Sequence, residues 1–172
     1  MRLRFGPQVL ALILLAGAAA SRAGDVYVSD YGSGGVKVFD QFSGSYLGTW
    51  GTGFVNRPTG IADDGHGNLF VADSALGEVF RFNDQNGAYE GNFGGGFIGN
   101  PYGLAVDSND VVYVANQGND NVQRFNGLTG NYMGGIGGGF AVSPMGLALD
   151  SSGNLYLGDY GSAKVLRFNS QT

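Results

Sequence analysis

The strongest constraint on the fold of this chain is an internal repeat with a period of 43 residues. Prolines and phenylalanines keep this step without insertions, at Pro58, Pro101 and Pro144 and at Phe39, Phe82, Phe125 and Phe168. A period of this length is typical of proteins that stack copies of one supersecondary unit. The copies are rich in glycine and in aromatic residues, which predicts short strands joined by glycine turns.

Each copy contains four strand-like runs, and the copy that begins at Pro101 shows them clearly. Its first run, 103–106, is apolar but small, as is typical of a strand beside a crowded axis. The second, 112–114, is apolar on both faces and predicts stacking of neighbouring sheets. The third and fourth, 122–125 and 132–136, are interrupted by polar residues or by glycine. Four antiparallel strands with a small innermost strand predict an all-β fold, a β-propeller built from such blades.

Three segments resemble the NHL repeat: Pro-Tyr-Gly-Leu-Ala-Val-Asp at 101–107, Asn-Leu-Phe-Val-Ala-Asp at 68–73 and Val-Phe-Arg-Phe at 79–82. The resemblance covers nearly all of residues 25–172, and exported bacterial NHL-repeat proteins are the most similar in pattern. It implies a β-propeller of four-stranded blades, of which the family usually has six. It implies no single function, because the same blade serves unrelated tasks.

The N-terminus has the pattern of a secretory signal peptide. Two arginines precede an apolar run, 9–16, and small residues follow it up to Ala23. The run is shorter than the roughly 20 residues that a membrane-spanning helix needs. We therefore expect residues 1–23 to be removed by cleavage after Ala23, with Ala18–Ala20 as a second candidate site. The mature chain is expected to be secreted or periplasmic.

The charge of the predicted mature chain excludes some classes of partner. Without the signal peptide, six cationic side chains remain against 14 carboxylates, a net charge of −8. Such a surface repels phosphate backbones and anionic lipids, so we expect no nucleic-acid partner and no membrane association after signal cleavage. The chain has no cysteine, so core burial and strand pairing must stabilise it in place of disulfides.

The strand-like runs do not complete the blades at the two ends of the repeat. The predicted mature chain, 24–172, opens on a second strand and ends in a third, which gives three, four, four and three strands. This predicts an open arc of four blades, half of a dimeric ring, or a fragment of a longer six-bladed product, because open sheet edges readily associate. The predicted divisions are a partial blade at 24–56, full blades at 57–99 and 100–143, and a partial blade at 144–172.

The best candidates for a binding site are four polar side chains that end the second strand of each copy: Asp30, Asp73, Asn116 and Asp159. They are expected to share one rim, where their oxygens can hold Ca²⁺ or another divalent ion or can contact a ligand. The competing interpretation is that each side chain caps its own hairpin through backbone N–H groups, and the equal spacing favours it. Tyr31 and Tyr160 follow two of these residues and are candidate aromatic contacts.

No constellation of catalytic residues stands out, and we predict none. His66 is the only histidine and occupies a turn position, so a multi-histidine zinc site is excluded. The glycine-rich segment 94–99 matches a dinucleotide fingerprint, but Pro101 and a strand follow it where a helix is required. The chain has no cysteine and no Gly-x-Ser-x-Gly motif. Three repeated arginines are expected to cover strand surface with their stems: Arg81, Arg124 and Arg167.

These observations favour an extracytoplasmic, non-catalytic binding or scaffold module over an enzyme. Its ligand is expected to be a protein, a peptide or a carbohydrate, without a cofactor, and a homo-oligomer can complete the ring. The main alternative is a divalent-metal-dependent lactonase- or lyase-like propeller enzyme that uses the rim carboxylates. A truncated fragment of a longer six-bladed protein is the third interpretation.

Overall fold

The computed structural model describes residues 13–15 and 25–169, which form fifteen strands and one short 3-10 helix, η1 (Gln117–Asn119). The strands make four antiparallel sheets. The first sheet contains β1 (Ile13–Leu15), β2 (Asp25–Asp30), β3 (Gly35–Asp40) and β4 (Tyr46–Trp50). The second contains β5 (Pro58–Asp63), β6 (Asn68–Asp73), β7 (Glu78–Asn83) and β8 (Tyr89–Phe93). The third contains β9 (Pro101–Val106), β10 (Val111–Asn116), β11 (Asn121–Asn126) and β12 (Tyr132–Ile136). The fourth contains β13 (Pro144–Leu149), β14 (Asn154–Asp159) and β15 (Lys164–Asn169).

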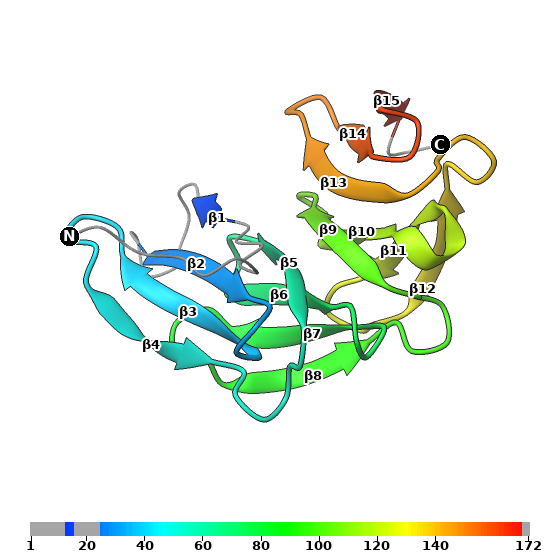
Figure 1. Cartoon of the computed structure of the whole chain (residues 1–172). Helices are drawn as coiled ribbons and strands as arrows, with labels where there is room; N and C mark the ends of the chain where they lie inside the picture. Colours follow the sequence, from blue (N-terminus) through cyan, green and yellow to red (C-terminus); the bar gives the residue numbers. More distant parts are fainter. Residues whose placement is uncertain (1–12, 16–24, 170–172) are drawn as a thin grey trace.

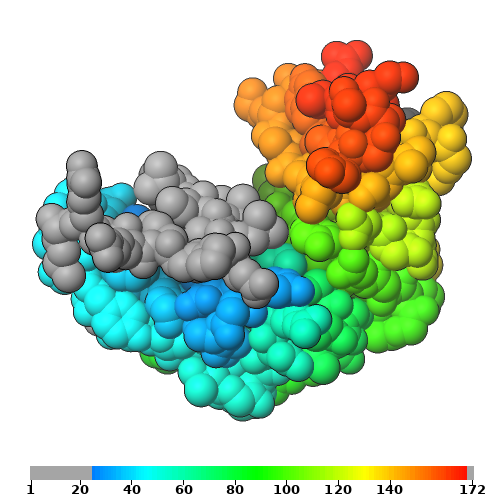
Figure 2. All heavy atoms as spheres, in the orientation of Figure 1, coloured from blue at the N-terminus to red at the C-terminus, as the bar shows by residue number. Residues whose placement is uncertain are grey.

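The four sheets follow one another as blades along an open arc, which confirms the predicted architecture (Figure 1). We call them blades 1 to 4 in chain order. The inner strands β5, β9 and β13 lie side by side, and each sheet runs outward from its inner strand in chain order. Blade 4 stands at one end of the arc, away from blade 1 (Figure 2). Within the described ranges, no helix is long and apolar enough to cross a bilayer.

Blade 1 differs from the prediction in its inner strand. We expected three strands, but β1 pairs with β2, so that Ile13 lies opposite Val28 and Leu15 opposite Val26. The physical reason is that a second strand without an inner neighbour would leave backbone N–H and C=O groups unpaired at its edge, and an extended segment satisfies them. This segment belongs to the apolar run that we assigned to the signal peptide, and signal cleavage stays a prediction. Blade 4 has three strands, as predicted.

Two kinds of sheet face join neighbouring blades. The face that we call aromatic carries a Tyr or Phe of the second strand and a Val of the third, such as Tyr27 and Val36 in blade 1. The face that we call aliphatic carries Val or Leu of the second strand and Phe of the third, such as Leu69 and Phe82 in blade 2. The aromatic faces of blades 1 to 3 each pack on the aliphatic face of the next blade. The buried residues of the three interfaces include Tyr27, Val36, Leu69, Val71 and Phe82, then Phe70, Val79, Val112, Val114 and Phe125, and finally Tyr113, Val122, Leu155 and Leu157.

Glycine lets the inner strands of neighbouring blades approach closely. A Cβ atom at Gly60 would collide with the carbonyl oxygen of Tyr102, and one at Gly103 would collide with that of Met145. Both obstacles are backbone atoms of the next inner strand, so a change of rotamer cannot remove them. The small residues predicted for the innermost strand are therefore required by backbone contact between blades.

Replacement of Gly103 by alanine is expected to destabilise the fold, because the added methyl group forces β9 and β13 apart. Overpacking of this kind costs about 1–3 kcal/mol, which lowers the melting temperature of a chain of this size by several degrees. Scanning calorimetry measures the change. Gly138→Ala is the matched control, since a Cβ there meets no atom within 4 Å. Equal losses in the two variants would contradict the packing argument.

Candidate functional site

The four predicted rim residues end β2, β6, β10 and β14, and backbone N–H groups engage their oxygens. In blade 1, Asp30 Oδ1 accepts hydrogen bonds from the amides of Gly32 and Ser33 at 3.1 and 3.2 Å. Lys37 Nζ lies 3.4 Å from Asp30 Oδ2. Burial alone would raise the pKa of the Asp30 carboxyl, but the hydrogen bonds from Ser33 and Lys37 and the Lys37 charge outweigh it and lower that pKa. Asp30 is thus an ionised cap of its own turn.

In blades 2 to 4 the equivalent side chains also hold the loop that enters the blade. Asp73 is fully buried, and its Oδ1 accepts from Ala75 N and Leu76 N in its own turn. Its Oδ2 accepts from Asn56 N and Arg57 N, at 2.5 and 3.1 Å, in the loop that precedes β5. Each of these three rim side chains thereby fastens an incoming loop to the second strand of the same blade.

Asn116 and Asp159 hold their loops in the same way. Asn116 Oδ1 accepts from Gly99 N at 2.8 Å, and both oxygens of Asp159 accept from Val142 N at 3.0 Å. The amide nitrogen of Asn116 also donates to Phe97 O, at 3.2 Å. Within the described residues, no hydrogen bond or ion pair joins one rim residue to another, and the structure does not gather them into one group of metal ligands.

The two predicted aromatic contacts lie in different blades. Tyr31 follows β2 in blade 1, and the guanidinium carbon of Arg57 lies 5.6 Å from the centre of its ring. Tyr160 follows β14 in blade 4 and is largely exposed. The strands that they follow, β2 and β14, belong to blades 1 and 4 at opposite ends of the arc (Figure 1), and so the structure gives the two tyrosines no common surface.

A second group of polar side chains lies in the turns between first and second strands of blades 2 and 3. His66 Nδ1 lies 2.9 Å from Asp110 Oδ1 in the neighbouring blade. The Asp64 carboxylate belongs to the same group, but it already accepts hydrogen bonds from His66 N and Asn68 N. The hydrogen bond to Asp110, together with the negative charge of that residue, raises the pKa of the His66 imidazole. Sequence reasoning found His66 as a turn residue and missed its partner.

Two further carboxyls lie beside this group, of which Asp84 is fully buried and Asp63 is half-buried. Burial is the main cause that raises the pKa of both Asp63 and Asp84, and the negative charge of Asp84 adds to the effect on Asp63. One carboxylate oxygen of each has no hydrogen-bond partner within the described part of the chain. No sequence signal singled out these two residues, because their environment depends on how the turns of blade 2 meet, as the hydrogen bond from Asp84 N to Gly67 O shows.

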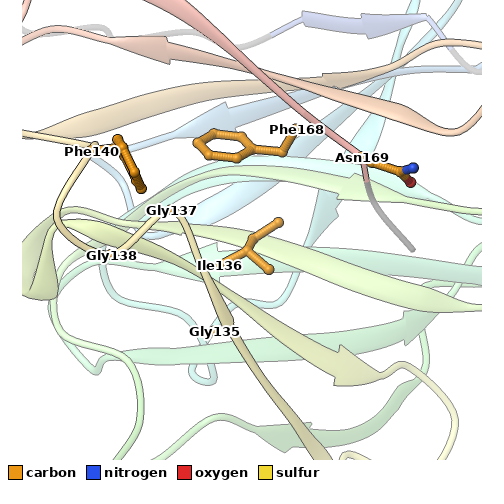
Figure 3. Close-up of a pocket in the computed structure, with 7 residues that line it drawn as sticks. All are labelled: Gly135, Ile136, Gly137, Gly138, Phe140, Phe168 and Asn169. Carbon is orange, nitrogen blue, oxygen red and sulfur yellow. The ribbon is translucent and has the colours of Figure 1, made fainter. Parts of the chain in front are cut away.

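A hollow of about 310 Å³ opens between β12 and β15. Figure 3 shows the side chains of Ile136, Phe140 and Phe168 around it, with the backbone of 135–138 forming one wall. Phe140 is 74% exposed. The hollow is therefore lined by two aromatic rings, one aliphatic side chain and glycine backbone, with Asn169 beside them.

The repeat shows what fills the equivalent position in two other blades. Phe54 and Phe97 are the counterparts of Phe140, one and two repeats earlier. Phe54 stacks on Tyr89 of β8 with ring centres 4.3 Å apart, and Phe97 stacks on Tyr132 of β12 at 4.2 Å. In both blades the tyrosine comes from the outer strand. The hollow is thus the place where an outer strand presents its tyrosine.

No protein-family model matches this chain, and no curated protein matches its sequence. The crystal structure of the computationally designed Ika4 protein matches with a TM-score of 0.69 and 15% identity, over 95% of this chain and 93% of that one. A chain of the nidogen/laminin complex matches with a TM-score of 0.72 and 21% identity, over 90% and 59% of the two chains. Hydrazine synthase of Kuenenia stuttgartiensis matches with a TM-score of 0.67 and 14% identity, over 86% and 46%.

The fold is a β-propeller. Four antiparallel meander sheets are arranged around adjacent inner strands, which is the architecture of propeller blades. The matches to solved structures extend over most of these sheets. At these identities the likeness concerns the fold alone. This propeller arc spans about 59% and 46% of the second and third matched chains, so their full lengths include more than the part it resembles.

Removal of the Asp73 carboxylate is expected to lower the free energy of unfolding by about 3 kcal/mol, since four backbone N–H groups lose a charged acceptor. Urea denaturation of Asp73→Ala measures the loss. Asp40→Ala serves as the control, because Asp40 caps an exposed turn through Phe42 N and Ser43 N. A loss no larger than that of Asp40→Ala would show that the loop into blade 2 is held by something else.

The His66–Asp110 pair is expected to stabilise the propeller at mildly acidic pH. The folded-state pKa of His66 is raised above its ordinary value of 6.5, so the stabilisation is full below that value and is lost as pH rises through the folded-state pKa. NMR titration should give a His66 pKa above 6.5 in the wild type and a lower one in Asp110→Asn. A His66 pKa that the substitution leaves unchanged would refute the assignment.

Proposed function

We propose that this protein is an extracytoplasmic, non-catalytic binding module of NHL type that captures an extended polypeptide segment along β15. The segment adds an outer strand to blade 4 and places one aromatic side chain in the hollow beside Phe140. The observation that carries the proposal is the stacking of Phe54 on Tyr89 and of Phe97 on Tyr132 in the other blades. Blade 4 offers the same aromatic surface to a strand from elsewhere.

The outer edge of β15 supplies the main-chain part of the recognition. In the described part of the chain, β15 pairs with β14 on one side only, so the other edge of residues 164–168 presents N–H and C=O groups to an incoming strand. Strand addition of this kind obtains affinity from main-chain hydrogen bonds and specificity from pockets for alternate side chains. The hollow provides one such pocket next to the edge.

The outer strands of the complete blades define the chemistry of the ligand. β4, β8 and β12 share the pattern Tyr-x-Gly-x-hydrophobic, as in Tyr89-Glu-Gly-Asn-Phe. In blade 2 the tyrosine lies opposite Phe82 and the glycine opposite Arg81. By the repeat, a ligand tyrosine lies opposite Phe168 and a ligand glycine opposite Arg167. The proposed ligand is therefore an extended peptide with this pattern.

The predicted export and the acidic surface fit this assignment. A signal peptide would direct the chain out of the cytoplasm, and the negative net charge disfavours phosphate-rich partners. Backbone N–H groups donate hydrogen bonds to the side-chain oxygens of the rim residues Asp73, Asn116 and Asp159. The proposal therefore gives these residues a structural role.

Peptide binding tests the proposal directly. A fluorescently labelled synthetic peptide that copies residues 86–95, including β8, is titrated with the purified chain, and its anisotropy is followed. Binding is expected, and it should weaken about tenfold in Phe140→Ala and with a peptide whose tyrosine is replaced by alanine, because the aromatic stack is lost.

Phe42→Ala is the matched control, since Phe42 is a phenylalanine in a turn of blade 1 and is at least as exposed as Phe140. It should leave the affinity unchanged. Failure of the peptide to bind at millimolar concentration, or equal binding to the wild type and Phe140→Ala, would overturn the proposal.

A further inference from the structure

The aromatic face of blade 4 is open to solvent. In blades 1 to 3 the valine of this face, Val36, Val79 or Val122, is completely buried under the next blade, whereas Val165 of blade 4 is 72% exposed. Figure 2 shows blade 4 at the end of the arc. The same kind of face is thus covered three times within the molecule and uncovered once.

The inner strand of blade 4 shows the same contrast. Gly60 and Gly103 are the counterparts of Gly146 in blades 2 and 3, and both lie against the backbone of the next inner strand. A Cβ atom at Gly146 would meet no atom within 4 Å. In blades 2 and 3, only glycine at this position lets the next inner strand approach so closely. Blade 4 therefore presents, in both its face and its inner strand, the surface on which a further blade packs.

Blade 1 carries the complementary surface at the other end of the arc. Its aliphatic face contains Val26, Val28 and Phe39, which are the counterparts of Leu69, Val71 and Phe82 in blade 2. Among the described residues, no blade of the same copy covers the aromatic face of blade 4 or the aliphatic face of blade 1. The two ends of the arc therefore match each other.

We propose that blade 4 of one copy packs on blade 1 of a second copy, through the same kind of interface that joins blades within each chain. The contact is head-to-tail, and two copies close it into a ring. Two arcs of four sheets give eight blades, at the upper end of the about four to eight blades that propellers contain. Peptide capture along β15 uses the outer edge of blade 4, so the ring does not depend on it.

A repeated arginine adds a polar contact to the proposed interface. Arg81 Nη1 in blade 2 donates to the carbonyl oxygens of Gly127 and Leu128 in the turn of blade 3, at 3.1 and 2.8 Å. Arg167 occupies the same position in exposed form in blade 4. The counterparts of the two acceptors in blade 1 are the carbonyl groups of residues 41–42, which Arg167 reaches in the second copy.

The molar mass in solution tests this proposal. Light scattering after size exclusion should give a dimer for the purified chain. Val165→Asp should weaken the dimer at least about a hundredfold and give a monomer, because it places a charge in an apolar interface. Because the side chain at position 165 is exposed in a single copy, the substitution should not disturb the fold of the monomer. Its thermal melting should therefore remain cooperative. Met133→Asp, at an exposed position of β12, should remain a dimer.

Photo-crosslinking identifies the partner surface without relying on the charged variant. Benzoylphenylalanine introduced at position 165 should crosslink to peptides from β2 and β3 of a second copy. A wild-type monomer at tens of micromolar, a Val165→Asp dimer as tight as the wild type, or crosslinks that map to blade 4 would each overturn the head-to-tail ring.

Discussion

The packing of an aromatic sheet face on an aliphatic one holds this protein together. A single sheet cannot cover its own faces, and each of the three buried clusters lies between two neighbouring blades. Burial of a large apolar side chain contributes about 1.5–3 kcal/mol. Because these side chains are buried between two blades, each one stabilises both of them. In a chain without cysteine, these contacts and the strand ladders have no covalent support.

The polar side chains of the arc act mainly within this apolar framework. Asp73 and its counterparts fix the loops that lead into the blades, and Arg81 ties one blade to the turn of the next. His66 and Asp110 link two turns across a blade boundary. What remains for recognition is the aromatic-lined hollow beside Phe140, the main-chain groups at the edge of β15 and the apolar face that carries Val165. For this reason both proposals concern polypeptide partners.

The repeat made the blades predictable, because residues that face a neighbouring blade must recur in every copy. It could not place β1, since an apolar run of this length fits a signal peptide and a short strand equally well. The sequence predicted the rim residues and their role as caps of their own turns. It did not predict that the second oxygen of Asp73 holds the loop before β5, because that contact depends on the tertiary path of the chain. The His66–Asp110 contact left a weak signal, because both residues fall in the same turn of successive copies. The stacking of Phe97 on Tyr132 left none, because the rings are 35 residues apart and belong to a loop and an outer strand.

The fastening of each incoming loop has a consequence for how such a chain can change in length. The three loop contacts, Asn56 with Asp73, Gly99 with Asn116 and Val142 with Asp159, each span 17 residues and lie within one repeat. Duplication or deletion of a whole repeat leaves every one of them intact and creates a blade boundary of a kind already present. The gene can therefore gain or lose blades by unequal recombination without a new core having to evolve, and only the surfaces at the two ends decide whether the result closes.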